Sequence, residues 1–153
     1  MLALGLIGIQ YPQLFGNGND IAHSAFLSGG GLALLAALFV LKPLVTSMCL
    51  WTGGSGGLFT PTLSTGAALG AFLGEAWSLA WPGSPVGSFA MVGAAAMIGA
   101  SMQAPLTALA LVLELTHSGF QMMVPMMAAV VTATALARHL DGYSIYSARL
   151  EAL

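Results

Sequence analysis

The chain has 153 residues, of which 58% are hydrophobic and only 5% are charged, and its formal net charge is −2. A soluble domain has about a quarter of its residues charged, so this composition excludes a soluble globular protein. Residues 43–74 and 76–113 carry no formal charge at all. The chain is therefore predicted to be an integral membrane protein, and it lacks the basic patch that nucleic-acid binding requires.

A series of helices separated by breaks is predicted from the apolar runs. A polar loop covers residues 11–20, and a helix is expected at 26–41 with a continuation at 45–51. Further helices are expected at 60–79, 86–101, 105–116 and 120–138, before a polar turn at 139–144 and a short final segment. Pro43 is expected to kink or end the first of these helices. Pro61 lies in the first turn of its helix, where its missing N–H costs nothing.

Several of these helices are shorter than the roughly 20 residues that cross the hydrocarbon layer. Breaks within apolar sequence persist in a membrane only where protein buries them or where they line a polar cavity. Broken helices of this kind are typical of transporters and channels. The four-residue spacing of Gly66, Gly70 and Gly74 allows two helices to approach closely, and we interpret this stripe as a packing surface.

The single cysteine, Cys49, excludes an internal disulfide, and no cluster of metal ligands accompanies it. We therefore predict no metal and no cofactor. The first residues, MLALGL, lack the positive region of a signal peptide. They read like the interior of a hydrophobic protein, so we expect the chain to be a piece of a longer one.

The stretch GGSGGLFTP at residues 53–61 has two competing interpretations. Its first five residues match G-x-S-x-G, in which Ser55 would be the nucleophile of an intramembrane serine hydrolase. That chemistry needs a histidine base close to the serine. His23, His117 and His139 all lie near loops or helix ends rather than in the middle of a helix. The nucleophile interpretation therefore has little support.

The second interpretation is an anion site at a helix N-terminus. A helix that begins near Leu58 leaves its first N–H groups without intrahelical partners and carries about half a positive charge at that end. Gly56 and Gly57 have no side chains to block an ion. Neutral dipoles bind an anion without a full countercharge, which suits a transported ion that must also leave the site. The alternative is that the glycines only form a tight turn, and the residues alone favour neither.

Three motifs in order resemble one family. Residues 53–70, GGSGGLFTPTLSTGAALG, strongly resemble the GGxFxP region of the CLC chloride channels and proton/chloride antiporters. Residues 99–116, GASMQAPLTALALVLELT, are similar to the later APLT…E-(L/M)-T segment of that family. Residues 144–150, SIYSARL, resemble its final membrane helix, which opens with a tyrosine. The resemblance covers essentially the whole chain.

The resemblance implies an anion-binding site. The backbone amides of Leu58 and Phe59 would coordinate a chloride ion, and the hydroxyl of Tyr146 would donate to the same ion. The supporting loop would consist of Gly56, Gly57 and Pro61. An interfacial aromatic anchor is the alternative role for the tyrosine. No catalytic residue and no metal ligand is implied.

For the whole chain, the resemblance implies an all-α membrane bundle of short, broken and tilted helices. Residues 1–153 would form the carboxy-terminal portion of a CLC-type transmembrane domain, with no separate soluble domain. The protein would transport chloride, as a channel or a proton-coupled antiporter, rather than act as an enzyme. It would be a homodimer in the plasma (inner) membrane, with helices 105–116 and 122–140 at the dimer contact. A different broken-helix transporter remains the other alternative.

Parts of the family's pathway have no counterpart in these residues. The GSGIP-like loop and the GREGP-like loop with its gating glutamate occur nowhere in the sequence. We therefore expect this chain to supply half of an anion pathway and not to transport alone. Glu114 is expected to have a structural, hydrogen-bonded role, Glu75 to lie at a membrane edge, and Asp20 and His23 to lie in a solvated loop. Arg138 and Arg149 indicate a cytoplasmic carboxy terminus.

Overall fold

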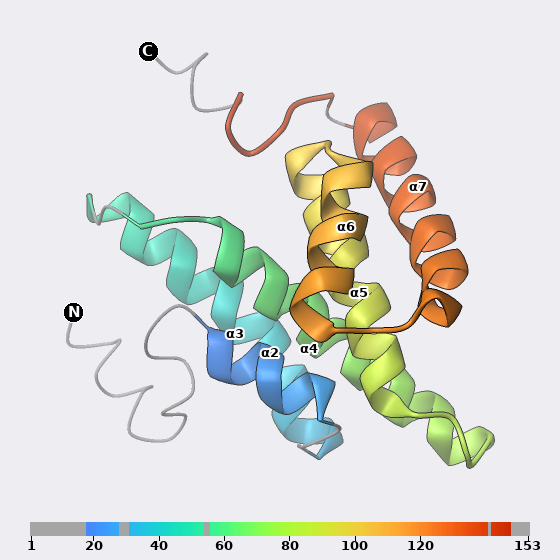
Figure 1. Ribbon diagram of the computed structural model, residues 1–153. Helices are drawn as coiled ribbons and strands as arrows, with labels where there is room; N and C mark the ends of the chain where they lie inside the picture. Colours follow the sequence, from blue (N-terminus) through green and yellow to red (C-terminus); the bar gives the residue numbers. More distant parts are fainter. Residues whose placement is uncertain (1–17, 28–30, 54–55, 141, 148–153) are drawn as a thin grey trace.

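The computed structural model describes residues 18–27, 31–53, 56–140 and 142–147 (Figure 1). Every regular element in these ranges is helical, as the sequence predicts. The elements are α2 (Asn19–Phe26), α3 (Leu32–Trp51), α4 (Phe59–Ala80), α5 (Val86–Met102), α6 (Pro105–Thr116), the 3-10 turn η2 (Phe120–Met122) and α7 (Met123–Leu140).

The lengths of these helices fit a membrane protein with incomplete spans. The helix α3 and the stretch Phe120–Leu140 are long and apolar enough to cross a bilayer, with mean hydropathies of 2.0 and 1.6. The helices α5 and α6 are apolar but shorter. Short apolar helices of this kind need protein around their ends to satisfy their backbone groups.

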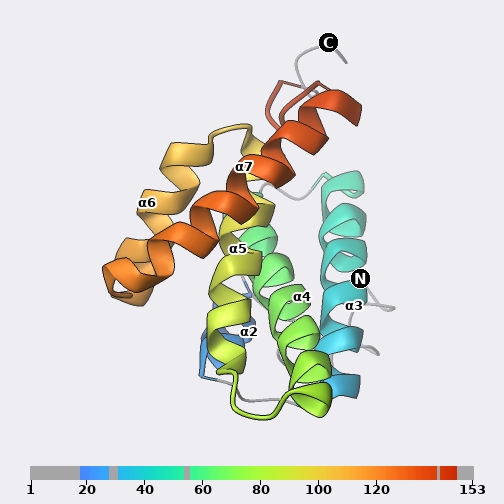
Figure 2. The same cartoon turned by 90° about the vertical axis from the view of Figure 1, so that its right-hand side faces the viewer.

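The helices form two groups that share α5. On one side of α5, α4 packs along its length and α3 packs against the far side of α4, while α2 lies across α4 and α5. On the other side, α7 and α6 pack against α5 (Figure 2). The helix α5 is therefore the centre of the described structure.

Glycine and alanine residues bring α4 and α5 into backbone contact. A Cβ atom added at Gly66 would lie 2.6 Å from the carbonyl oxygen of Gly93, and one added at Gly70 would clash with the carbonyl oxygen of Phe89. Ala67 and Ala90, one from each helix, are fully buried. The packing role predicted for the glycine stripe is confirmed.

Two of the predicted elements differ from the structure. The polar loop expected at 11–20 lies mostly outside the described residues, but its end already belongs to α2. The helix expected at 26–41 begins only at Leu32, and it continues through Pro43 to Trp51 as one helix. Proline removes one N–H and strains the preceding turn, yet the apolar residues on both sides favour a helix. Pro43 therefore does not end the helix, and residues 45–51 continue it, as expected.

The breaks around α5 and α6 follow their residues. Gln103 ends α5 with a left-handed backbone (φ 55°), and Ala104 before Pro105 is extended (φ −123°). The extended residue reflects the clash that proline imposes on a helical predecessor. The helix α6 has the predicted bounds, and His117 ends it with φ 48°.

Candidate anion-binding site

The N-terminus of α4 is uncapped. Leu58 is the N-cap residue with φ −83° and ψ −12°, and it makes no side-chain cap hydrogen bond because leucine has no acceptor. Phe59 is the first helical residue. The N–H groups at this end have no intrahelical acceptor. A backbone with two adjacent N–H donors and the positive end of a 22-residue helix dipole can bind an anion.

The first turn of α4 is held by bonds that leave these N–H groups unused. The carbonyl oxygen of Leu58 accepts the N–H of Thr62 at 3.1 Å and the hydroxyl of Thr62 at 2.7 Å. Pro61 has no N–H to offer. Phe59 is partly buried and packs against the main hydrophobic core, which fixes the direction of the helix end.

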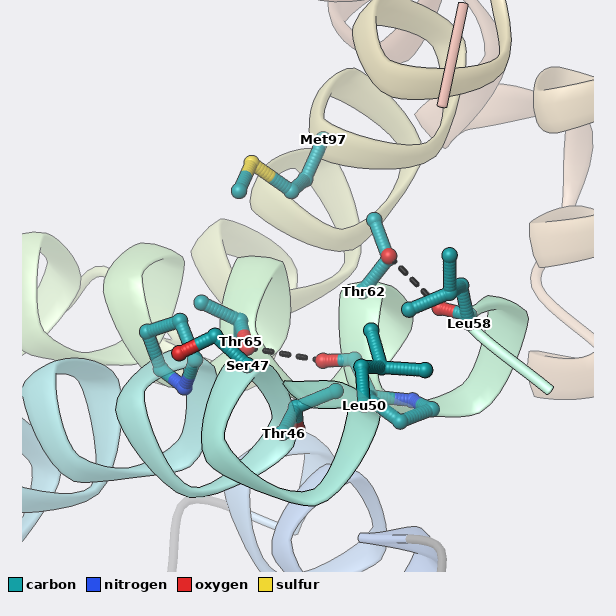
Figure 3. A pocket seen from close by; sticks show the side chains of 9 residues that line it. Thr46, Ser47, Leu50, Leu58, Thr62, Thr65 and Met97 are labelled. Atoms are coloured by element: carbon teal, nitrogen blue, oxygen red, sulfur yellow. Dashed lines mark hydrogen bonds between the residues drawn. The ribbon is translucent and has the colours of Figure 1, made fainter. Parts of the chain in front are cut away.

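A pocket of about 190 Å³ lies between α3 and α4, next to this helix end. Figure 3 shows side chains from the two helices around it, with a methionine of α5 completing the wall. The lining residues are Pro43, Thr46, Ser47, Leu50, Leu58, Pro61, Thr62, Thr65 and Met97. Leu58 thus belongs both to the helix N-terminus and to the wall of the pocket.

The hydroxyl groups in this pocket do not offer their protons to it. Thr62 and Thr65 donate to carbonyl oxygens of α4 at 2.7 Å, and Thr46 and Ser47 donate to carbonyl oxygens of α3 at 2.8 Å. Each bond spans three or four residues of the same helix, a common arrangement for Ser and Thr in membrane helices. An anion near α4 would therefore meet backbone N–H donors rather than hydroxyl donors from these four side chains.

The glycine loop before α4 is open. Gly56 and Gly57 are exposed, and a Cβ atom added at either would meet nothing within 4 Å. These two glycines are therefore not required for close packing within the described residues. The loop leaves space in front of the helix N-terminus, where an ion would approach. Ser55, the alternative nucleophile, lies outside the described residues.

Tyr146 lies in the segment 142–147, after α7. The N–H of Ile145 donates to the carbonyl oxygen of Ser101 at the end of α5, at 2.9 Å. Tyr146 is 54% exposed, and it is not part of the pocket wall beside Leu58. Both views show the segment at the end of the molecule where α4 begins (Figures 1 and 2). The three predicted ligand residues thus come from two separate parts of the chain.

The remaining polar residues named above lie away from this helix end. Asp20 and His23 are exposed, as expected, but they belong to α2 and not to a loop. Glu114 is exposed, and its backbone carbonyl accepts the N–H of His117 at 3.3 Å. The hydrogen-bonded side chain predicted for Glu114 is absent from the described structure, because α6 turns this residue outward. In the described residues no group of three metal-ligating side chains occurs.

Lys42 belongs to none of the sequence motifs described above. It is 2% exposed and lies in α3 directly before Pro43. An ionisable residue within an apolar helix is a functional candidate by default, and that signal was present in the sequence.

Comparison with known proteins identifies the family. The family model described as voltage gated chloride channel matches residues 1–138 of the 153. The chain belongs to the voltage gated chloride channel family. The membership makes this chain part of an integral membrane protein, and it gives the serine-hydrolase alternative no support.

Members of the family with similar sequences are transporters. The H(+)/Cl(-) exchange transporter ClcA of Klebsiella pneumoniae is 35% identical over 149 residues, which cover 96% of this chain. The proteins of the same name from Citrobacter koseri and Salmonella arizonae are 34% identical over 145 residues, or 94% of the chain. The chain spans only 31% of the Klebsiella relative and 30% of the Citrobacter relative.

Proposed function

We propose that this chain forms one wall of the anion pathway in a chloride-transporting membrane protein. The observation that carries the proposal is the uncapped N-terminus of α4, which faces open space beyond Gly56 and Gly57. Its N–H groups would replace part of the hydration shell of chloride near Leu58 and Phe59. Backbone dipoles bind an ion without a full countercharge, so the ion can leave again.

In this proposal Tyr146 gives the anion a third donor. A phenol donates one hydrogen bond and stays neutral at physiological pH, so it adds specificity without trapping the ion. The segment 142–147 is attached to the end of α5 through Ile145, and the amides belong to α4. The ion would therefore join the amino-terminal end of one helix to the segment that follows α7.

We further propose that transport is exchange of chloride for protons. The support is that the relatives from Klebsiella and Citrobacter are named H(+)/Cl(-) exchange transporters. The loop motif with the gating glutamate is absent from these 153 residues. The proton-transferring groups would then come from outside them, and this chain would contribute to anion binding only.

A homodimer in the plasma membrane, which is the inner membrane of bacteria such as those of the relatives, completes the proposal. The outward face of α7 supports it, because it carries a shallow apolar hollow of about 520 Å³ lined by Met123, Val124, Met127, Ala128, Val131 and Thr132. The hydroxyl of Thr132 donates to carbonyl oxygens of α7 itself, at 2.8 and 3.0 Å. This face therefore presents apolar atoms to a second copy or to lipid.

The proposal is tested by removing one amide. Leu58→Pro deletes the N–H while it keeps a backbone angle near the −83° of the native residue. A hydrogen bond to a charged group contributes about 1.5–3 kcal/mol, so we expect roughly tenfold or greater loss of chloride affinity. Calorimetric titration of the whole protein that contains this chain, with chloride flux from proteoliposomes, measures the effect.

The matched control is Leu58→Ala, which removes the same side chain from the pocket wall and keeps the N–H. We expect its chloride affinity to stay within about threefold of the native value, because the donor remains. Equal affinities in the proline and alanine variants would contradict the assignment of this amide.

A further inference from the structure

Lys42 takes no part in the proposed coordination of the anion. Of the charged side chains in the described residues, Lys42 is the buried one, at 2% exposure. Burying an ammonium group is costly, and in membrane helices such residues usually serve a function. It lies in the middle of α3, on the side that packs against α2 and α4 rather than on the outside.

The side chain of Lys42 lies close to Gly18 and to the side chain of Ser64. The Cε atom of Lys42 lies 2.8 Å, and the Oγ atom of Ser64 2.5 Å, from the point where a Cβ atom on Gly18 would sit. Gly18 has φ 83°, a left-handed conformation that glycine adopts without strain. The lysine therefore reaches from α3 across the start of α2 to the buried side of α4.

This point on α4 is close to the helix N-terminus. Ser64 comes five residues after Phe59, which corresponds to about 7.5 Å along a helix axis. The hydroxyl of Ser64 donates to the carbonyl oxygen of Pro61 at 3.0 Å, which directs its side chain back toward the first turn. The end of the Lys42 side chain, located by its Cε atom beside Ser64, is thus on the order of 10 Å from the first N–H groups of α4.

A charge at this distance acts on an ion that it does not touch. Salt screens surface charges over about 10 Å, but buried charges are screened much less. At a separation on the order of 10 Å and an effective dielectric constant of ~20, one unit charge changes the affinity for a monovalent anion by roughly tenfold.

We propose that Lys42 supplies a fixed positive charge that strengthens anion binding at the N-terminus of α4 without contacting the ion. The proposal rests on the proposed anion site at Leu58 and Phe59. A charge set back from the ion raises the local anion concentration, yet it leaves the ion held only by neutral donors. Lys42 is thus a determinant of anion affinity rather than a ligand.

The first pair of variants changes the charge at position 42. Lys42→Met removes the charge and keeps an unbranched apolar side chain, whereas Lys42→Arg keeps the charge. We expect chloride to bind about tenfold more weakly to the methionine variant, and the arginine variant to stay within about threefold of the native protein. Chloride titration of the purified whole protein measures the affinity, and its thermal unfolding midpoint is recorded in parallel.

The second pair leaves the lysine in place and changes its neighbour. Ser64→Asp places a carboxylate beside the ammonium group and neutralises its field, and Ser64→Asn introduces a side chain of the same size without charge. Both substitutions crowd Gly18 equally, so the difference between them reports charge alone. We expect the aspartate variant to bind chloride about tenfold more weakly than the asparagine variant. This pair decides the question if Lys42→Met does not fold.

Two results would overturn the inference. One is native chloride affinity in a folded Lys42→Met variant, and the other is equal affinity in the Ser64→Asp and Ser64→Asn variants. The proposed site fails separately, when Leu58→Pro and Leu58→Ala bind chloride equally. If the Lys42 variants bind chloride with native affinity while Leu58→Pro binds it more weakly than Leu58→Ala, the role of the distant charge is rejected and the amide site is supported.

Discussion

Tyr146 and Tyr143 are similar in exposure but not in proposed role. They are three residues apart in the segment after α7, and they are 54% and 53% exposed. Tyr146 is the residue proposed to bind chloride, whereas Tyr143 is proposed to be an interfacial aromatic residue. This pair therefore separates ion binding from membrane anchoring.

We predict that Tyr146→Phe weakens chloride binding by about tenfold, because one hydrogen bond to a charged ion is lost, and that it lowers the coupling of chloride to protons. Tyr143→Phe removes the hydroxyl of an equally exposed tyrosine and leaves both quantities unchanged. Chloride titration and paired chloride and proton flux from proteoliposomes are the measurements. Identical behaviour of the two variants would argue for an anchoring role.

For single residues, the sequence predicted where α4 begins, but it did not predict how Tyr146 lies relative to the start of that helix. The start of α4 was predicted at residue 60 and occurs at Phe59, because Pro61 and the glycines before it determine the position locally. The location of Tyr146 relative to Leu58 depends on how the segment after α7 lies against α5. That contact is non-local, and no periodicity in the sequence encodes it.

Among the elements, the contact between α4 and α5 is the closest. A Cβ atom on Gly70 would overlap the carbonyl of Phe89, and that carbonyl belongs to a helix backbone that cannot move aside easily. We predict that Gly70→Ala destabilises the protein by about 1–3 kcal/mol or more, as expected for overpacking. The measurement is thermal unfolding in detergent.

The matched control for this prediction is Gly119→Ala. Gly119 has φ −68°, which every residue tolerates, and an added Cβ atom there meets nothing within 4 Å. Its unfolding midpoint should equal that of the native protein. If both variants unfold at the native temperature, the close approach of α4 and α5 does not contribute to stability.

The sequence predicted α6 correctly and misjudged the region before α4. The bounds of α6 follow from Pro105 at its start and the polar residues after Thr116. In contrast, Phe26 was assigned to the long apolar helix, although it ends α2, and Pro43 was expected to kink or end a helix that continues to Trp51. Proline reduces helix stability locally, but surrounding protein supplies partners for the freed backbone groups in a membrane helix.

For the whole molecule, the outward face of α7 provides the test of assembly. Val131 lies in the apolar hollow and is 54% exposed. We predict that Val131→Trp shifts the protein from dimer to monomer, because the bulky ring prevents two such faces from packing together. Size-exclusion chromatography with light scattering in detergent measures the mass.

Leu140→Trp is the control for this test. Leu140 belongs to the same helix and is 74% exposed, but nine residues of helix place it about 180° away from Val131. The control should remain dimeric. Dimers in both variants would place the contact between copies elsewhere on the protein.

The glycine contact between α4 and α5 also limits how the protein can move during a transport cycle. Two backbones in direct contact have no side chains between them that could change rotamer, so one helix cannot slide along the other without opening a gap. The two helices must then move as one body, and the amides of Leu58 and Phe59 would move with it. The segment 142–147 is attached to α5 through the hydrogen bond from Ile145 to Ser101. Through that bond the segment would move with the same body, so Tyr146 and the two amides would keep their spacing while other parts of the pathway move.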